Sequence, residues 1–233
     1  TLMALCSSIK KNTNIKVVLC GEGADEIFGG YERYKMFSRN DNNMSIEKLI
    51  YSYNHVAIPR LKLLTKEPFI ISQKRYDIFQ EVKSEDIFNT LLLYDQKTFL
   101  GSYLHRQDRV GMMFSLEIRT PYLDHNLVNF INDIPSKNKY NSQYQKLILR
   151  LLGDKFVDNR IIWNQQKIAF SFPISNSFDN GFLKVLFQNS FKNGFLLENF
   201  YNVDGISVLL NEQSNGINHS NTLWRIICLE NWL

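Results

Sequence analysis

Three carboxylates follow a short apolar run that ends at Cys20: Glu22, Asp25 and Glu26, with glycines such as Gly21 between them. On a helix these three positions fall on one side, where the acids repel one another unless a positive partner is bound. Mg²⁺ suits that role because it prefers carboxylate and phosphate oxygens. The alternative is helix capping, for which one or two acids are enough. We favour a site, because ligands of α/β proteins bind beyond the carboxyl ends of strands.

A second region, from Arg106 to Asp124, alternates charged and apolar residues. Such alternation is typical of a solvated face or of internal salt bridges, and this interpretation stays open. Pro121 restricts the residue before it, Thr120, to an extended conformation. Arg119 is therefore expected to be held at a turn, and a fixed guanidinium suits phosphate or carboxylate recognition.

A third candidate is Lys167, in a loop predicted over 164–173. A single lysine in a loop is most often an ordinary surface residue. Here the neighbours Trp163, Ile168 and Phe170 are apolar and would hold the ammonium in place and partly dry. A point charge in that setting can stabilise a phosphoryl-transfer transition state.

The elements that must position these residues begin with a helix over 1–11 and a strand over 15–20. The continuous apolar character of this strand predicts burial on both faces, as in a parallel sheet. A helix is predicted from 23 or 24 to about 36. The pair Gly29 and Gly30 inside it is unfavourable for a helix, so we attribute it to close packing against a backbone or a ligand.

Further along, the periodicity of apolar residues predicts mainly helices. The longest amphipathic pattern covers 85–107, with Gly101 as a candidate interruption. The remaining predicted helices lie at 45–55, at 124–131 and at 145–152, with a short helical turn at 156–161. Two or three more are predicted within 176–233 around an Asn-rich loop at 211–221. Only one segment has a clear strand pattern. A whole sheet therefore cannot come from this chain alone unless segments with weaker strand patterns contribute.

Composition limits the classes of function. The 233 residues are 44% hydrophobic, and the net charge of +4 comes from scattered lysines and arginines, which does not indicate nucleic-acid binding. No apolar run reaches the length of a membrane span. The three cysteines show no paired spacing, which favours a reduced, cytoplasmic setting. The chain begins with Thr1, inside a predicted helix, as expected for a fragment, a processed product or a deliberately shortened chain.

Three motifs together resemble the synthetase domain of the glutamine-dependent asparagine synthetases. Residues 18–31, Val-Leu-Cys-Gly-Glu-Gly-Ala-Asp-Glu-Ile-Phe-Gly-Gly-Tyr, are similar to the family's Ser-Gly-Glu/Asp-Gly-Ala/Ser-Asp-Glu-Leu-Phe-Gly-Gly-Tyr. Residues 108–124 resemble its Asp-Arg-x-Ser-Met-x-x-Ser-x-Glu-x-Arg-x-Pro-Phe-Leu-Asp, and 167–173 resemble its Lys-x-Gly-Phe-x-x-Pro. The closing segment 223–233 also has the family's character, so the likeness extends over essentially the whole chain.

The resemblance implies an α/β fold: the C-terminal, helix-rich part of an adenine-nucleotide α-hydrolase-like (HUP) domain with few parallel strands. It also implies a reaction that uses ATP and Mg²⁺. A carboxylate, aspartate by default, attacks the α-phosphorus of ATP and releases pyrophosphate. Ammonia then displaces AMP from the acyl-adenylate and gives the amide.

The resemblance also assigns roles to residues. Glu22 would lie beside the acyl-adenylate and take a proton from the incoming ammonia, and Asp25 would ligate Mg²⁺. Lys167 would balance charge on the α-phosphate, and Arg109 would face pyrophosphate or substrate.

The remaining assignments concern binding. Backbone groups of Cys20 and Gly21 would contact the nucleotide, and Glu117 and Arg119 would shape the floor of the substrate pocket. Cys20 stands where the family usually has Ser, a small change if the backbone makes the contact.

Two family elements do not occur in the chain: the Ser-Gly-Gly-x-Asp-Ser loop that cradles pyrophosphate, and the glutaminase that supplies ammonia from glutamine. Residues 1–233 are therefore expected to form a partial synthetase domain, inactive alone. A sugar or peptide carboxylate is an alternative acceptor, and a homodimer is left open. Two other hypotheses are a non-catalytic or partner-completed remnant and a helical interaction protein in which the acids only cap a helix.

Overall fold

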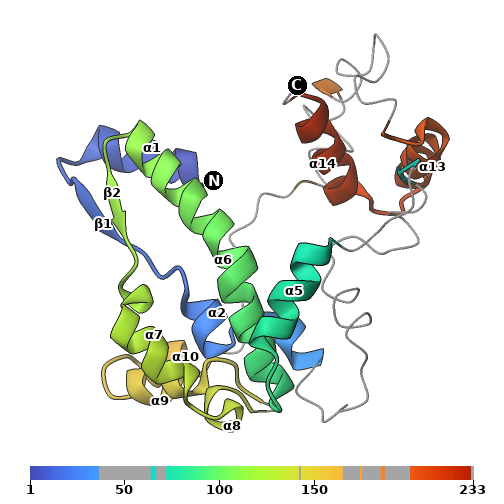
Figure 1. Cartoon of the computed structure of the whole chain (residues 1–233). Coiled ribbons are helices and arrows are strands. Elements are labelled where there is room, and N and C mark those ends of the chain that lie inside the picture. Colours follow the sequence, from blue (N-terminus) through green and yellow to red (C-terminus); the bar gives the residue numbers. More distant parts are fainter. Residues whose placement is uncertain are drawn as a thin grey trace. The chain divides into compact units, whose positions relative to one another are not determined.

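The structure is a computed structural model that describes residues 1–36, 64–66, 72–141, 143–164, 174, 185–186 and 200–231 (Figure 1). The chain divides into two compact units. The first comprises Thr1–Asn43 and Ser72–Phe170, and the second comprises Met44–Ile71 and Ser171–Leu233. Among the described residues, no helix is long and apolar enough to cross a membrane.

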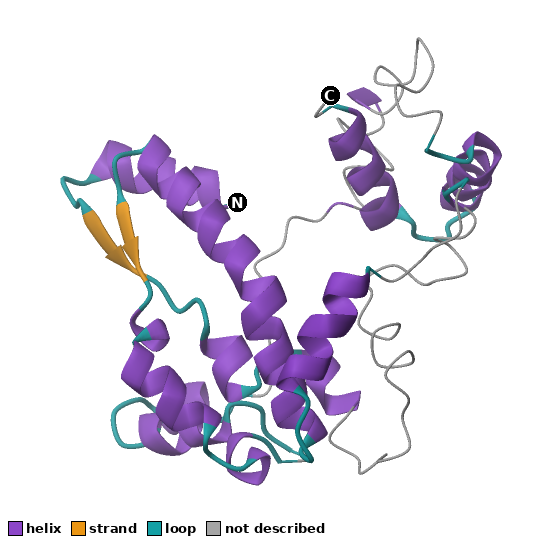
Figure 2. Cartoon of the chain, in the orientation of Figure 1, coloured by secondary structure: helices purple, strands orange, loops and turns teal. Residues whose placement is uncertain are grey.

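The first unit is mainly helical and is organised around the 27-residue helix α6 (Figure 2). Helix α6 packs against α1, α2, α5 and strand β2. It begins where the side chain of Asp86 accepts hydrogen bonds from the backbone N–H groups of Phe88 and Asn89, an N-cap contact. The helices of this unit are α1 (Leu2–Asn12), α2 (Ala24–Phe28), η1 (Glu32–Met36), α5 (Gln73–Val82), α6 (Ile87–Met113), η2 (Pro121–Leu123), α7 (His125–Asn132), α8 (Ser136–Lys139), α9 (Leu147–Gly153) and α10 (Asn159–Ile162).

The sheet of the described chain has two parallel strands, β1 (Val17–Leu19) and β2 (Glu117–Arg119), with Val18 opposite Ile118. The predicted strand is confirmed, but the predicted burial on both faces is wrong. Val17 and Leu19 are 41% and 69% exposed. The apolar run has the composition of a covered parallel strand, and no described residue supplies that cover.

The predicted helix over 23–36 is interrupted. Helix α2 ends at Gly29, which adopts φ 74° and ψ 54°, and the chain resumes as the short helix η1. A Cβ at Gly29 would lie 2.5 Å from Cζ of the buried Phe88, so a side chain would fit neither the conformation nor the space. The glycine pair is closely packed as predicted, but against the side chains of Phe88, Asp25 and Lys146 rather than against a backbone or a ligand, and the predicted continuous helix is wrong.

Helix α6 is not interrupted at Gly101, where a Cβ would meet nothing within 4 Å. The helices predicted at 124–131 and 145–152 are confirmed as α7 and α9, and the helical turn predicted at 156–161 overlaps α10. The helix predicted at 45–55 lies outside the described residues. The side chain of Asp124 caps α7 through the N–H groups of Asn126 and Leu127. Strand β2, in the charged segment before Pro121, was not predicted as a strand.

The core beneath the acidic segment is formed by α2 and α7. Its buried residues are Ala24, Ile27, Phe28 and Ile131. Tyr122, from η2, contacts Phe28 edge-on with ring centroids 5.8 Å apart. This packing fixes α2, and with it the acids at its start.

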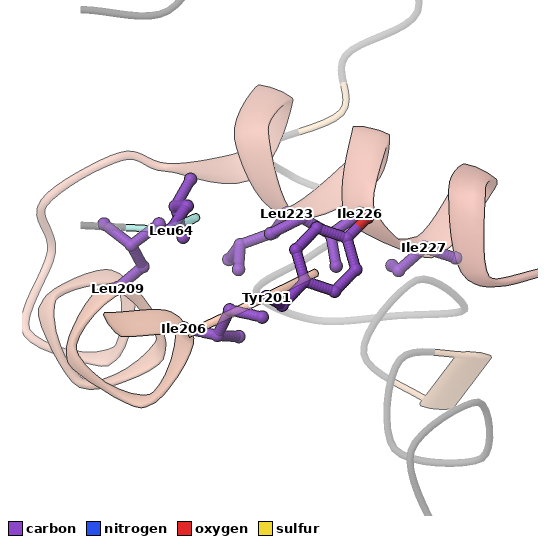
Figure 3. Close-up of a cluster of buried hydrophobic side chains, with 7 residues drawn as sticks. All are labelled: Leu64, Tyr201, Ile206, Leu209, Leu223, Ile226 and Ile227. Atoms are coloured by element: carbon purple, nitrogen blue, oxygen red, sulfur yellow. The ribbon is translucent and has the colours of Figure 1, made fainter. Parts of the chain in front are cut away.

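The second unit has its own apolar core, shown in Figure 3. Helices α13 (Val203–Ser214) and α14 (Ser220–Glu230) supply most of it, and an antiparallel bridge joins Thr65 to Tyr201. The buried residues are Leu64, Tyr201, Ile206, Leu209, Leu223, Ile226 and Ile227. Two described helices agree with the prediction for this region, although α13 continues into the predicted loop at 211–221.

Candidate active site

The candidate site lies in the first unit, at the carboxyl ends of the two parallel strands. The backbone N–H of Cys20 donates to the carbonyl of Arg119 at 2.9 Å, which continues the pairing of β1 with β2 past Leu19. The acidic segment therefore leaves the sheet at the edge where β2 ends. This is the edge at which open α/β sheets bind ligands.

Glu22 is held by a side chain from helix α6. Gln107, 8% exposed, donates from Nε2 to Oε2 of Glu22 at 2.8 Å and lies 3.2 Å from Sγ of Cys20. The backbone N–H of Glu22 lies 3.3 Å from the same sulfur. Burial raises the pKa of the Glu22 carboxyl, and the positive charge of Arg106 opposes this rise. One amide thus fixes both a carboxylate and the thiol beside it.

Asp25 pairs with a lysine that the sequence did not single out. Oδ1 of Asp25 lies 3.0 Å from Nζ of Lys146, and both side chains are about a quarter exposed, at 26% and 28%. Lys146 immediately precedes α9, so this contact joins the start of α2 to a segment more than a hundred residues away.

Glu26 belongs to the interior. It is 1% exposed, Oε1 accepts a hydrogen bond of 2.6 Å from the hydroxyl of Tyr31, and its backbone carbonyl accepts one of 3.2 Å from Nε2 of Gln96. Burial raises the pKa of the Glu26 carboxyl, and the hydrogen bond from Tyr31 opposes the rise. The three acids therefore have separate partners, which corrects the expectation that one positive partner serves them all.

The donor set limits how a metal could bind. Within the described part of the chain, no group of three or more His, Cys, Asp or Glu side chains could hold a metal ion. Mg²⁺ is usually bound by one or two carboxylates together with phosphate oxygens and water. Asp25, partly exposed at the end of the strand, fits as one such ligand. The described residues do not form a complete metal site by themselves.

A basic hollow lies along one face of α6. The cavity has a volume of about 700 Å³ and is lined by Gly101, Ser102, His105, Arg106, Arg109 and Val110. Arg109, predicted to face an anion, is one of its two arginines. Arg106 also lies over the ring of Tyr103, 4.5 Å from the centroid, a cation–π contact. The same helix thus presents positive charge and the amide that fixes Glu22.

The other predicted residues are less enclosed. Glu117 and Arg119 lie on β2 and pair with each other, with Oε1 and Nε 2.8 Å apart and both side chains more than half exposed. This matches the salt bridge that the sequence left open, and their role in a pocket floor stays a prediction. Gly21 is exposed in the turn before α2. Lys167 lies outside the described residues, so its role is untested.

Two contacts were missed from the sequence. Gln107 lies within the charged region that was singled out, and its place on the inward face of the amphipathic helix was a usable signal. Lys146 had no comparable local signal, since it falls within the helix predicted at 145–152 like any other lysine of a helix.

Parallel pairing with acids at the strand ends makes this chain part of an α/β protein. The family model described as asparagine synthase matches residues 1–233, and the chain belongs to that family. No solved structure matches.

Curated relatives agree with this membership. Asparagine synthetase (glutamine-hydrolyzing) 3 of Bacillus subtilis (strain 168) is 27% identical over 186 residues, which are 71% of this chain and 28% of that protein. Asparagine synthetase (glutamine-hydrolyzing) 1 of the same organism is 28% identical over 209 residues, covering 72% and 32%. Amidase chry2 of Gibberella zeae is 24% identical over 217 residues, covering 68% and 32%. The chain thus spans about a third or less of these relatives.

Proposed function

We propose that this chain contributes to an ATP-dependent ligase that converts a carboxylate into an amide. A carboxylate oxygen attacks the α-phosphorus of ATP, and pyrophosphate leaves. Ammonia then attacks the carbonyl carbon of the acyl-adenylate, loses a proton and expels AMP. The observation that carries the proposal is the arrangement on α6, where Gln107 fixes Glu22 and Arg106 and Arg109 line a basic hollow.

Glu22 is proposed as the group that takes a proton from ammonia. Its carboxylate is oriented by the neutral Gln107 amide at 2.8 Å, and Arg106 is a charged neighbour on the same helix. A fixed carboxylate within reach of the reacting nitrogen is what general base catalysis requires. Arg109, and Arg106 with it, are proposed to bind the anionic leaving group, and Lys167 to balance the α-phosphate.

Asp25 is proposed to hold Mg²⁺ together with phosphate oxygens. The ion would neutralise phosphate charge during the transfer. The backbone of Cys20 and Gly21 is proposed to contact the nucleotide, because the chain turns there at the carboxyl end of β1. Glu117 and Arg119 are proposed to border the acceptor pocket from the end of β2.

We also propose that a further segment of the same synthetase domain completes the site. The exposure of Val17 and Leu19 on a two-stranded parallel sheet supports this, because such strands are normally covered. The proposed occupant is a parallel strand that ends in the Ser-Gly-Gly-x-Asp-Ser loop. Ammonia is proposed to come from glutamine through a glutaminase domain, and a cytoplasmic location and a homodimer stay predictions.

Aspartate is the default acceptor. A sugar or peptide carboxylate is the second candidate, since one relative bears the name of an amidase rather than of an asparagine synthetase.

ATP–pyrophosphate exchange with a panel of carboxylates tests the function in the full-length protein. Glu22→Gln is expected to lower amide formation about a hundredfold or more, as for loss of a general base, and Lys167→Ala to lower exchange. Glu85→Gln, at an exposed position before α6, is the control. If neither variant impaired either reaction, the assigned roles would be wrong.

The coding sequence upstream separates an enzyme from a remnant. An in-frame Ser-Gly-Gly-x-Asp-Ser segment and an N-terminal cysteine glutaminase support the ligase, whereas a stop codon supports a non-catalytic or partner-completed product.

A further inference from the structure

Lys146 has an unusual backbone conformation. Its φ of 53° and ψ of 40° are left-handed, and among the described residues only Ser115 is another non-glycine with positive φ. This conformation is unfavourable for a residue with a Cβ. Such strain persists where surrounding contacts fix it. The contacts of this lysine therefore need an explanation.

The side chain of Lys146 passes next to the backbone of Gly30 and reaches Asp25. Its Nζ lies 3.0 Å from Oδ1 of Asp25. A Cβ at Gly30 would collide with that oxygen and with Cε of Lys146. The backbone N–H of Gly30 also donates to the carbonyl of Asp25 at 2.9 Å. Gly30 thus leaves the space in which the ion pair forms.

The pair lies at the edge of the candidate site rather than in the core. Both side chains keep about a quarter of their surface exposed. Lys146 also stabilises the charged form of Glu22 electrostatically. The ammonium therefore pairs with Asp25 and also acts electrostatically on Glu22.

We propose that Lys146 is a positioning residue, which rests on the proposed function: its ammonium fixes the Asp25 carboxylate at the mouth of the nucleotide site. It also offsets the repulsion between Asp25 and Glu22 before a cation binds. The competing interpretation is a purely structural ion pair that attaches α9 to α2.

The two interpretations differ in what the variant Lys146→Met does in the full-length protein. Methionine is likewise unbranched, is one atom shorter, has the same cost in the left-handed conformation and removes the charge. Removing a positive charge beside a metal ligand is expected to tighten Mn²⁺ binding about fivefold, measured by electron paramagnetic resonance. The kcat of ATP–pyrophosphate exchange is expected to fall about tenfold or more, because the carboxylate is no longer held.

Two variants and one control complete the test. Lys146→Arg keeps the charge and is expected to recover part of kcat. Lys146→Gly relieves the left-handed strain without restoring the charge and is expected to stay impaired. Lys155→Met, at an exposed position after α9, is expected to behave as wild type in both measurements.

Unchanged kcat in Lys146→Met, or recovery of kcat in Lys146→Gly, would overturn the proposal in favour of a structural pair. Wild-type protein without exchange on any carboxylate would instead overturn the proposed function. In that case the Mn²⁺ measurement still decides: equal affinity in wild type and Lys146→Met overturns the positioning role as well.

Discussion

The helical part of the first unit buries charged side chains, whereas its sheet exposes apolar ones. Glu26, Asp95 and Lys139 are each 1% exposed inside the helical part, whereas Val17 and Leu19 on the sheet are 41% and 69% exposed. Charged residues are rarely buried unless they are paired, and exposed apolar patches usually mark contact surfaces. The helical part therefore has the character of a finished interior, whereas the sheet has the character of a contact surface.

Each buried charge has a partner in the same unit. Glu26 accepts from Tyr31, Asp95 pairs with Arg33, and Lys139 donates to Asn89. On the sheet, by contrast, no described residue covers the apolar side chains of Val17 and Leu19. The polar contacts that fix the acids are thus built from this chain, while the strand that precedes the acids leaves Val17 and Leu19 exposed.

The largest effect is expected from breaking a buried charge pair in the helical part. Oδ2 of Asp95 lies 2.5 Å from Nη2 of Arg33 and also accepts a hydrogen bond from the hydroxyl of Tyr34. Asp95→Asn removes the charge and keeps the shape, so Arg33 loses its counter-ion. Unfolding in urea should show a loss of about 3–5 kcal/mol.

Asp108→Asn is the matched control, because Asp108 lies on the same helix at an exposed position. Its effect should stay within about 0.5 kcal/mol. Equal losses in the two variants would contradict the view that the buried charges hold this region together.

The second effect concerns pH. Burial lowers the pKa of Lys139 from its usual 10.5 to about 8, although Asp86 and Asp133 oppose the shift. Between these two values the unfolded chain binds more protons than the folded one, so this group adds stability as the pH rises from 8 to 10.5. The full gain corresponds to about 3 kcal/mol.

Lys139→Met should lack this gain. The measured quantity is the free energy of unfolding of wild type minus that of the variant, at several pH values, so that other titrating groups cancel. A difference that stays flat or falls from pH 8 to 10.5 would show that the ammonium is not buried as described.

The third effect tests the space at Gly30. Gly30→Ala must push Asp25 or Lys146 aside, and such overpacking is expected to cost about 1–3 kcal/mol. Gly101→Ala adds the same methyl group in open space in the middle of α6, where it should stabilise by about 0.5–1 kcal/mol. Urea unfolding of the pair checks this, and the same sign for both variants would refute it.

The smallest effect is expected on the sheet. Leu19→Ser in the 233-residue chain should change stability by less than about 0.5 kcal/mol, because Leu19 is 69% exposed. In a longer protein in which a further strand or helix covers this residue, the same substitution should cost about 2 kcal/mol or more. Equally small effects in the 233-residue chain and in the longer protein would argue against a further segment that covers Leu19.

The sequence predicted the elements whose signals are local. Helices α1, α6, α7 and α9 follow from apolar periodicity, and Asp124 is a typical cap residue that does cap α7. Close packing at the glycine pair was predicted because a glycine is costly in a helix without such a reason, but the neighbours are side chains rather than the predicted backbone or ligand.

The rest depends on contacts between distant segments. The break at Gly29 requires the ring of Phe88, and the partner of Asp25 lies before α9. Strand β2 has charged residues at both ends and forms because β1 lies beside it. For the site, the acids and Arg109 were found from residue type, whereas Gln107 and Lys146 needed the fold.

Helix α6 also sets a spacing. Gln96 and Gln107, which contact the carbonyl of Glu26 and the side chain of Glu22, are eleven residues apart on one uninterrupted helix. Eleven residues make about three turns and 16 Å, so both amides emerge on nearly the same side. Inserting or deleting one residue between them would rotate one amide by about 100° relative to the other. One end of the acidic segment would then lose its hydrogen bond to α6. The spacing of the two glutamines along α6 therefore matches the distance between the two contact points on the acidic segment.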